Sequence, residues 1–466
     1  MSLIEKSATE VVALLVNGAV SPADLIDALQ QRIEAVDTSV NALPTLCFDR
    51  ARDHARALVG QTYGPLHGLP VVIKDLSAVS GVRSTSGSPI FAEHIPNRSS
   101  HGVERIEASG GIVYAKSNTP EFGAGANTFN EVFGATRNPW NTRLSAAGSS
   151  GGSAVALATG MAWLAHGSDM GGSLRNPASF CGVVGLRPSP GRVLSGPCAD
   201  PFDPLSTDGP MARTVDDVAL FLDAMCGHDP REPLSLDAPA RTFRKAAAAR
   251  HRPARIAFSS DLGIAPVDPE VADICRAAAL RFEGLGVIVE EAAPDVSQAH
   301  EVFQVLRAHA YATGMSDLLA EHRDALKPEV IWNIEKGLAL TSGEIGVAQR
   351  GRADMIAGAA SFFETYDLLL TPATIVPPFP IEERFVSSCN GVKFETYIDW
   401  LAIVYAITLI GHPALSLPCG FTREGLPVGL QMVGRSRGEA ALLAAAGVLE
   451  DELGLAHIPI VPRSHS

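Results

Sequence analysis

Apolar residues recur at helical spacing near the start of the chain. Leu25, Leu29 and Ile33 fall four residues apart, so their side chains share one face of a helix. Ser21 precedes this stretch and is followed by a proline, which is the pattern of a capped helix start. Residues 1–60 are therefore predicted to be helical and to cover a larger body.

Short, mostly apolar runs later in the chain predict buried strands. These runs are Leu69–Ile73, Gly110–Ala115, Arg255–Phe258, Val287–Val289, Asp367–Leu370, Ala414–Leu417 and Val428–Val433. Helical patterns at 154–164, 268–283 and 439–453 alternate with them. The alternation predicts an α/β layered architecture, in which the β-α-β unit at 255–289 is either a small insertion or a lobe of the same fold.

Residues 146–189 form the stretch that is richest in glycine and serine. A linker is not expected there, because Ala154–Leu164 has a strongly apolar helical pattern. Small residues around a helix and a strand indicate backbone segments that approach each other closely. This stretch is therefore the first place to look for a functional site.

Composition and charge favour an ordered globular protein that does not bind nucleic acid. The chain has 466 residues, of which 46% are hydrophobic and 19% charged, which favours a large ordered core. Its net charge of −14 repels phosphate backbones, so nucleic-acid binding is not expected.

The seven cysteines are scattered and form no C-x-x-C pair, which speaks against a zinc knuckle and a disulfide framework. No signal peptide is recognised, and no apolar run approaches the ~20 residues of a membrane span. We expect a cytoplasmic protein without a membrane segment, metal or cofactor.

Candidate chemistry centres on serines. Gly171 and Gly172 precede Ser173, and glycines allow consecutive N–H groups to converge on an oxyanion. A serine nucleophile also needs a base. His166 lies seven residues earlier but is better explained as a packed histidine, whereas Lys74 follows an apolar run and could act if burial kept it neutral.

Two alternatives stay open at this point. From spacing alone, Lys74 is best explained as an ordinary lysine paired with Asp75. The tract around Ser150 also satisfies the G-x-S-x-G pattern of a nucleophile elbow, with Ser150 as the nucleophile. A phosphate-binding Walker loop is not indicated, because neither glycine-rich tract contains a lysine.

Taken together, several motifs resemble the amidase signature family. They are Gly68–Asp75, Asn118–Phe122, Arg137–Asn141, Gly148–Ser153, Gly167–Arg175, Cys181–Pro188, Gly411–Pro418 and Gly425–Gln431. The resemblance implies one α/β/α domain over residues 1–466, built around a large mixed, mostly parallel twisted sheet. Within it we expect a helical cover (1–60), a signature core (65–215), an inserted lobe (250–345) and a closing segment (365–455).

The resemblance also implies a Ser–Ser–Lys triad. Ser173 would be the nucleophile, and Ser149, which lies 24 residues earlier and follows a cis peptide bond, would connect it to Lys74. Backbone N–H groups of Met170, Gly171, Gly172 and Ser173 would form the oxyanion hole. Arg175 is expected to anchor the nucleophile loop through a carboxylate such as Asp169.

The expected reaction is hydrolysis of the C–N bond of a small-molecule amide by water. Gly123, Gly125 and Asn127 are predicted to border the substrate pocket. Linear amides, aryl amides, carbamates and urea-like compounds all stay open, as does a role as the glutaminase subunit of a tRNA-dependent amidotransferase. The segment Ile334–Thr341 lacks the basic stretch of such subunits, which favours a free-standing amidase, with a homodimer as the default assembly.

Overall fold

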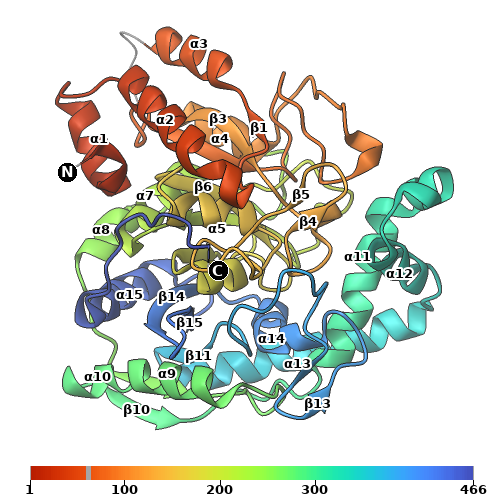
Figure 1. The fold of residues 1–466 in the computed structure, drawn as a ribbon. Coiled ribbons are helices and arrows are strands. Elements are labelled where there is room, and N and C mark those ends of the chain that lie inside the picture. The colour runs from red at the N-terminus through yellow and green to blue at the C-terminus, as the bar shows by residue number, and fades with distance from the viewer. Residues whose placement is uncertain (1, 59–63, 465–466) are drawn as a thin grey trace.

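A computed structural model describes residues 2–58 and 64–464 (Figure 1). Its centre is an eleven-stranded sheet with the strand order β1-β3-β2-β6-β8-β7-β14-β15-β11-β9-β10. In chain order the strands of this sheet are β1 (Thr45–Leu46), β2 (Pro70–Lys74), β3 (Ile112–Ser117), β6 (Leu164–Asp169), β7 (Val184–Arg187), β8 (Thr207–Ala212), β9 (Arg255–Phe258), β10 (Ile288–Glu291), β11 (Leu368–Pro372), β14 (Ala414–Phe421) and β15 (Pro427–Gly434). Two small hairpins, β4 (Phe129–Asn130) with β5 (Gly134–Ala135) and β12 (Ser388–Cys389) with β13 (Val392–Lys393), lie outside it.

The predicted mixed sheet is confirmed, but it contains more antiparallel pairing than the resemblance implied. Parallel pairs join β2 to β3 and β6 near one end, and β9 to β11 and β10 at the other. From β6 through β8, β7, β14 and β15 to β11, neighbouring strands are antiparallel. The short turn between β14 and β15 is one reason, because a tight hairpin can join only antiparallel strands.

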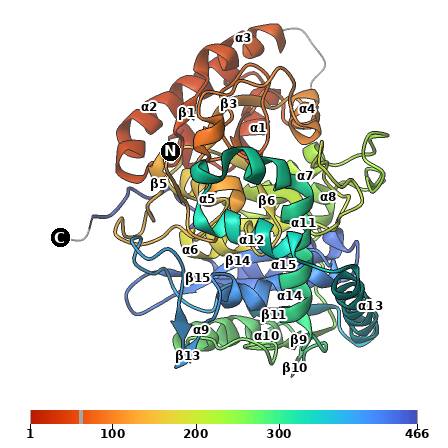
Figure 2. The same ribbon diagram turned by 90° about the vertical axis from the view of Figure 1, so that its right-hand side faces the viewer.

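The helices alternate with the strands along the chain. They are α1 (Ala8–Val16), α2 (Pro22–Val40), α3 (Phe48–Leu58), α4 (His101–Ala108), α5 (Gly151–Ala158), α6 (Arg175–Cys181), α7 (Val215–Met225), α8 (Phe243–Ala248), α9 (Pro269–Ala279), α10 (Arg281–Gly284), α11 (Ala299–His322), α12 (Pro328–Leu338), α13 (Ser342–Thr365), α14 (Ala402–Ile410) and α15 (Glu439–Leu453). Helices α11 and α12 pack against each other at one side of the molecule (Figure 1 and Figure 2).

Helices cover both faces of the sheet. In β15, a Cβ added to Gly429 would meet Ser179 of α6, whereas a Cβ added to Gly434 would meet Leu442 of α15. Side chains an odd number of positions apart in a strand point to opposite faces, so α6 and α15 lie on opposite sides. Every residue of β15 is buried, as expected for a strand covered on both faces.

Most predicted elements are confirmed, with three corrections. The predicted helical cover over residues 1–60, of which 59 and 60 lie outside the described residues, contains the short strand β1 of the main sheet. The helix predicted over 268–283 is divided into α9 and α10 at Leu280. Ser21 caps α2, and the last helix occupies the predicted residues. The helix predicted over Ala154–Leu164 ends at Ala158 instead. Gly160 has a φ of +73°, which a continuing helix cannot accommodate, and Leu164 already belongs to β6.

The unit formed by β9, α9 and β10 extends the main sheet at its edge. Within the described residues, no helix is both long and apolar enough to cross a membrane. The same part of the chain contains no group of three or more His, Cys, Asp or Glu side chains arranged to hold a metal ion.

Candidate active site

Lys74 ends β2, and its side chain is fully buried. Its Nζ atom donates to Ser149 Oγ at 2.6 Å and to Ser168 Oγ at 3.0 Å. The carboxylate of Asp75 instead pairs with Lys116, at 2.7 Å. Consecutive residues at the end of a strand point to opposite faces, so the interpretation of Lys74 as a partner of Asp75 is wrong.

Burial lowers the pKa of Lys74 from 10.5 to about 7, because the charged ammonium loses its hydration. The negative charges of Asp208 and Asp169 act in the opposite direction and limit the fall. At neutral pH a large share of the lysine is therefore uncharged. An uncharged amine within hydrogen-bond reach of a serine hydroxyl can accept its proton.

Ser149 follows a cis peptide bond with Gly148, the conformation that the family resemblance implied. A Cβ added to Gly148 would lie 3.1 Å from both Asn127 N and Thr128 Oγ1, so any larger residue would require these neighbours to shift. Thr128 Oγ1 also donates to the carbonyl of Ala147 at 2.8 Å. The segment that leads into Ser149 is therefore closely packed against residues 127 and 128.

Ser150 is fully buried, unlike the exposed serine of a nucleophile elbow. Its hydroxyl donates to the Ser168 carbonyl at 3.3 Å and accepts from the Ser168 N–H at 3.4 Å. Its own N–H donates to the Ser173 carbonyl at 3.2 Å. Ser150 therefore joins the two glycine-rich tracts and does not open into a cavity.

Ser173 lies in the loop between β6 and α6 and is partly exposed. It lines a cavity of about 130 Å³ together with Ser149, Ser168, Gly123 and Gly125. The structure thus brings both predicted serines to one cavity, with Lys74 behind Ser149. A larger hollow of about 690 Å³ adjoins it, and Ser168 borders both.

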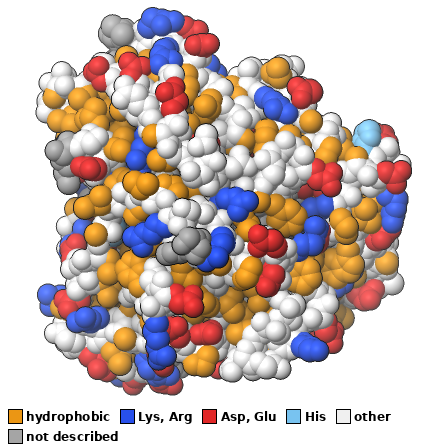
Figure 3. Space-filling view, viewed as in Figure 1, with side chains coloured by type: hydrophobic (Ala, Val, Ile, Leu, Met, Phe, Trp, Pro, Cys, Tyr) orange, Lys and Arg blue, Asp and Glu red, His pale blue; other side chains and the backbone are white. Residues whose placement is uncertain are grey.

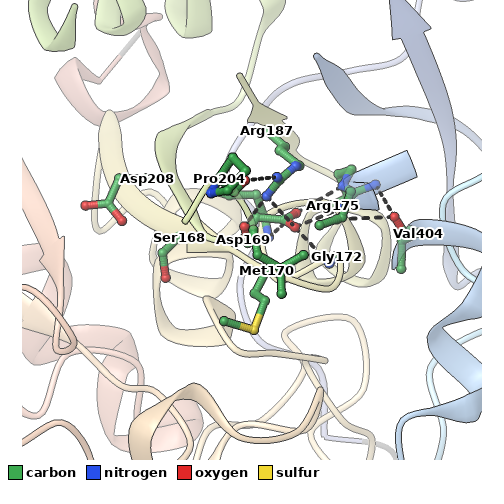
Figure 4. A network of polar contacts seen from close by, with 12 residues as sticks. Ser168, Asp169, Met170, Gly172, Arg175, Arg187, Pro204, Asp208 and Val404 are labelled. Carbon is green, nitrogen blue, oxygen red and sulfur yellow. Dashed lines mark hydrogen bonds and ion pairs between the residues drawn. The ribbon is translucent and has the colours of Figure 1, made fainter. Parts of the chain in front are cut away.

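The loop that carries Ser173 is held by the fully buried carboxylate of Asp169 (Figure 4). As predicted, Arg175 is its partner, with Nε 3.0 Å from Oδ2 and Nη2 2.9 Å from Oδ1. Arg187 pairs with the same carboxylate at 3.6 Å. Burial alone would raise the pKa of Asp169, but the two guanidinium groups hold that pKa well below its usual value.

The N–H group of Gly172 cannot be one of the donors of the predicted oxyanion hole. The Gly172 N–H donates to Asp169 Oδ1 at 2.8 Å, so it points into the loop and away from the cavity. Met170, Gly171 and Ser173 do line the cavity. In the described part of the chain, the N–H groups of Gly171 and Ser173 have no hydrogen-bond acceptor, which leaves them available to a substrate oxygen.

Gly123 and Gly125 border the cavity as predicted, whereas Asn127 is not among its lining residues. The side chain of Asn127 is buried and donates to the carbonyls of Ile381 and Glu383. It also accepts from Ser145 Oγ at 2.7 Å. These three bonds use the amide within the protein, so Asn127 supports the loop beneath Ser149 and does not face the cavity.

Gly123→Ala is expected to lower kcat by about ten- to a hundredfold, since small misplacements of reacting groups are costly. The new Cβ would lie 3.3 Å from Ser149 Oγ and 3.0 Å from Leu76 Cδ1, at a φ of +68°. Gly125→Ala is the matched control, because its φ is also positive (+102°) but its Cβ would meet only Lys327 Nζ, at 3.9 Å. Steady-state kinetics of both variants, with melting temperatures, test this. Equal losses of kcat would show that backbone strain alone is responsible.

Several residues of the cavity wall were not predicted from the sequence, and two of them, Ser168 and Arg307, bear on its chemistry. Ser168 lies inside the motif Gly167–Arg175, and its distance from Lys74 becomes visible only when β2 and β6 pair. Arg307 comes from α11, far along the chain and outside the recognised motifs. No local pattern in the sequence could have found it.

Comparisons with known proteins place the chain in a family. The family model described as "Amidase" matches residues 24–443. The chain is 37% identical over 455 residues to an acylamidase of Rhodococcus erythropolis, covering 95% of this chain and 94% of that protein. It is 36% identical to a glutamyl-tRNA(Gln) amidotransferase subunit of Moorella thermoacetica, with 97% of each chain covered.

Among solved structures, a bacterial aryl acylamidase of the amidase signature enzymes superposes with a TM-score of 0.90 at 30% identity, covering 96% of each chain. The family model spans most of the sequence, and the relatives are matched over nearly their whole length. These findings, together with the Lys74–Ser149 contact and the shared cavity, lead to one conclusion: the chain belongs to the amidase family.

Proposed function

We propose that this amidase cleaves carboxylic amides through an acyl-enzyme on Ser173, with Ser149 and Lys74 as the proton relay. The observation that carries the proposal is the 2.6 Å contact between Lys74 Nζ and Ser149 Oγ, on the cavity that Ser173 also lines. A buried lysine with a lowered pKa and a hydroxyl in contact with it form the base that a serine nucleophile requires.

In the first half-reaction, Ser173 Oγ attacks the carbonyl carbon of the amide. Its proton moves to Ser149, whose own proton moves to neutral Lys74. The carbonyl oxygen becomes an oxyanion, which the N–H groups of Met170, Gly171 and Ser173 stabilise. The C–N bond then breaks while the relay returns the proton to the leaving nitrogen, and the amine departs.

In the second half-reaction, water attacks the acyl-enzyme. The relay takes a proton from the water, and the same N–H groups stabilise the second oxyanion. When the ester bond to Ser173 breaks, the proton returns to the serine oxygen and the carboxylic acid leaves. Every proton taken up by Lys74 is thus given back, and the reaction consumes one amide and one water.

The similarity to an acylamidase and an aryl acylamidase supports simple acyl amides, including anilides, as substrates. Carbamates and urea-like compounds are the alternative within the same chemistry. On the face shown in Figure 3, acidic and basic side chains are interspersed, which fits a small-molecule substrate better than nucleic acid. Cytoplasmic location, the homodimer and independence of a cofactor stay predictions.

A second candidate function is the glutaminase subunit of a tRNA-dependent amidotransferase. The 36% identity to the amidotransferase subunit of Moorella thermoacetica favours it. Incubating the purified chain with glutamine and measuring ammonia separates the two functions. Ammonia release at rates comparable with anilide hydrolysis would favour the glutaminase role, and anilide hydrolysis alone would favour the free-standing amidase.

Labelling with a fluorophosphonate tests the nucleophile. Trypsin releases Leu144–Arg175 as one peptide that contains Ser149, Ser150 and Ser173, so fragment spectra must locate the adduct. We expect the adduct on Ser173, at a rate that falls strongly in Lys74→Met. An adduct on Ser150, or equal labelling of the Lys74→Met protein, would contradict the proposed relay.

A further inference from the structure

Arg307 of α11 is a buried cation in the wall of the cavity that Ser149 and Ser173 line. Only 6% of its surface is exposed. Among the other buried guanidinium groups, that of Arg175 is paired with a carboxylate, whereas those of Arg213 and Arg352 donate to backbone carbonyls and lie outside this cavity. Within the described residues, Arg307 forms no ion pair with Asp or Glu.

The groups around Arg307 are neutral. Its Nη2 donates to the phenol oxygens of Tyr397 at 2.7 Å and Tyr311 at 3.2 Å, and its Nη1 contacts Met170 Sδ at 3.3 Å. The guanidinium carbon lies 4.6 Å from the centre of the Tyr311 ring. Nε is buried and has no hydrogen-bond partner in the described part of the chain. These neighbours orient the guanidinium but supply no negative charge.

A buried charge without a counter-charge is costly, because it has lost its hydration and gained no partner. The other walls of the cavity include Phe303, Ile398 and Leu401. Such apolar walls strengthen any electrostatic contact made inside. An anionic group on a bound substrate would supply the missing partner.

We propose that the enzyme prefers amides that bear a carboxylate, which Arg307 binds while the amide carbonyl lies at Ser173. The inference rests on the function proposed above. Met170 links the two positions, because its sulfur contacts Arg307 and its backbone belongs to the proposed oxyanion hole. Nη1, whose neighbour in the protein is only the weakly accepting sulfur of Met170, is the atom that would donate to the carboxylate, and the guanidinium keeps its charge at any working pH.

Two matched substrate pairs test this. N-phenylsuccinamic acid is compared with 4-methyl-N-phenylpentanamide, where an isopropyl group replaces the carboxylate on the acyl side. 4-Acetamidobenzoic acid is compared with 4-isopropylacetanilide, where the same replacement is made on the amine side. Release of the aromatic amine gives kcat/KM for each compound. In at least one pair we expect the acid to be favoured at least about tenfold, the range of a charge-assisted hydrogen bond, and that pair shows which half carries the carboxylate.

Variants then assign the preference to Arg307. Arg307→Met should abolish it and Arg307→Lys should retain part of it. Arg323→Gln is the control, because Arg323 is 53% exposed at the end of α11 and does not line the cavity. It should keep the wild-type ratio.

The inference is overturned if the wild-type enzyme favours the isopropyl compound in both pairs, or cleaves neither acid. An unchanged ratio in Arg307→Met would overturn it as well. Fluorophosphonate labelling of Ser173 distinguishes this failure from that of the proposed function. If Ser173 is labelled and only the preference is absent, the catalytic proposal stands.

Discussion

Replacing Ser173 by alanine is expected to lower kcat at least about 10⁴-fold, the scale on which loss of a catalytic serine acts. The hydroxyl that would form the acyl-enzyme is gone, and neither Ser149 nor Ser150 can take its place. Ser149 Oγ is held by Lys74, and Ser150 Oγ is buried against the backbone of Ser168. Steady-state hydrolysis of an activated anilide measures the loss.

The matched control is Ser150→Ala, which removes a hydroxyl from the adjacent glycine-rich tract. We expect kcat to stay within about tenfold of the wild type, since only hydrogen bonds of about 1 kcal/mol each are lost. Both variants should keep the melting temperature within a few degrees, which excludes unfolding as the cause. A larger loss in Ser150→Ala than in Ser173→Ala would identify Ser150 as the nucleophile.

Lys74→Met is expected to reduce kcat/KM by about 10²- to 10⁴-fold, the usual contribution of a positioned base. In the wild type, activity requires uncharged Lys74, whose pKa is lowered to about 7. The wild-type kcat/KM should therefore rise with pH through a midpoint near 7, and the residual activity of the variant should lack this midpoint. A flat wild-type profile between about pH 5.5 and 9 would argue against lysine as the base.

The same substitution is expected to stabilise the fold. The pKa of Lys74 is about 7 in the folded chain and about 10.5 in the unfolded chain, so the unfolded state binds the proton more tightly. Burying Lys74 therefore lowers the free energy of unfolding most strongly below pH 7, and this destabilisation disappears as the pH rises towards 10.5.

Methionine has a similar length and no charge. Lys74→Met should raise the melting temperature by several degrees at pH 6 to 7, and the gain should shrink at higher pH. Melting curves across this range, with Lys116→Met as a second buried lysine, provide the comparison. Lys116 is paired with Asp75, so its replacement should destabilise the protein. A destabilised Lys74→Met protein at every pH would contradict the lowered pKa.

The sequence predicted those parts of the site that lie in short, continuous motifs. Lys74 follows an apolar run and Ser149 lies in a glycine-rich run, and both runs can be recognised without knowledge of tertiary contacts. The catalytic roles of the two residues were predicted from the family resemblance. Their 2.6 Å contact depends on β2 and β6 pairing side by side, which no local pattern encodes. The helix predicted over 154–164 was too long because apolar periodicity continued past Gly160 into a strand.

The predictions about Gly172 and Asn127 were wrong for the same reason, which is that other groups in the protein use their hydrogen-bonding atoms. Gly172 and Asn127 have the right composition for a site, but their polar groups are used by Asp169 and by loop carbonyls. Arg307 was not predicted because it is notable only for lying in the cavity wall without an ion pair to the described residues. Its position relative to other residues is known only from the structure. Sequence patterns predict where polar groups occur, and tertiary packing decides which of them a ligand can reach.

The order of the strands has a consequence for how the protein is made. Strand β7 and strand β11 are joined only through the β14–β15 hairpin, which comes last among the strands along the chain. Until a ribosome has synthesised residues 414–434, the strands made so far can form only two separate sheets, because no hydrogen-bonded strand lies between β7 and β11. Each of these sheets has an unpaired edge strand. Such edges invite pairing with other chains. Newly made protein should therefore depend on chaperones until synthesis is almost complete, and stalling the ribosome before Ala414 should yield aggregates.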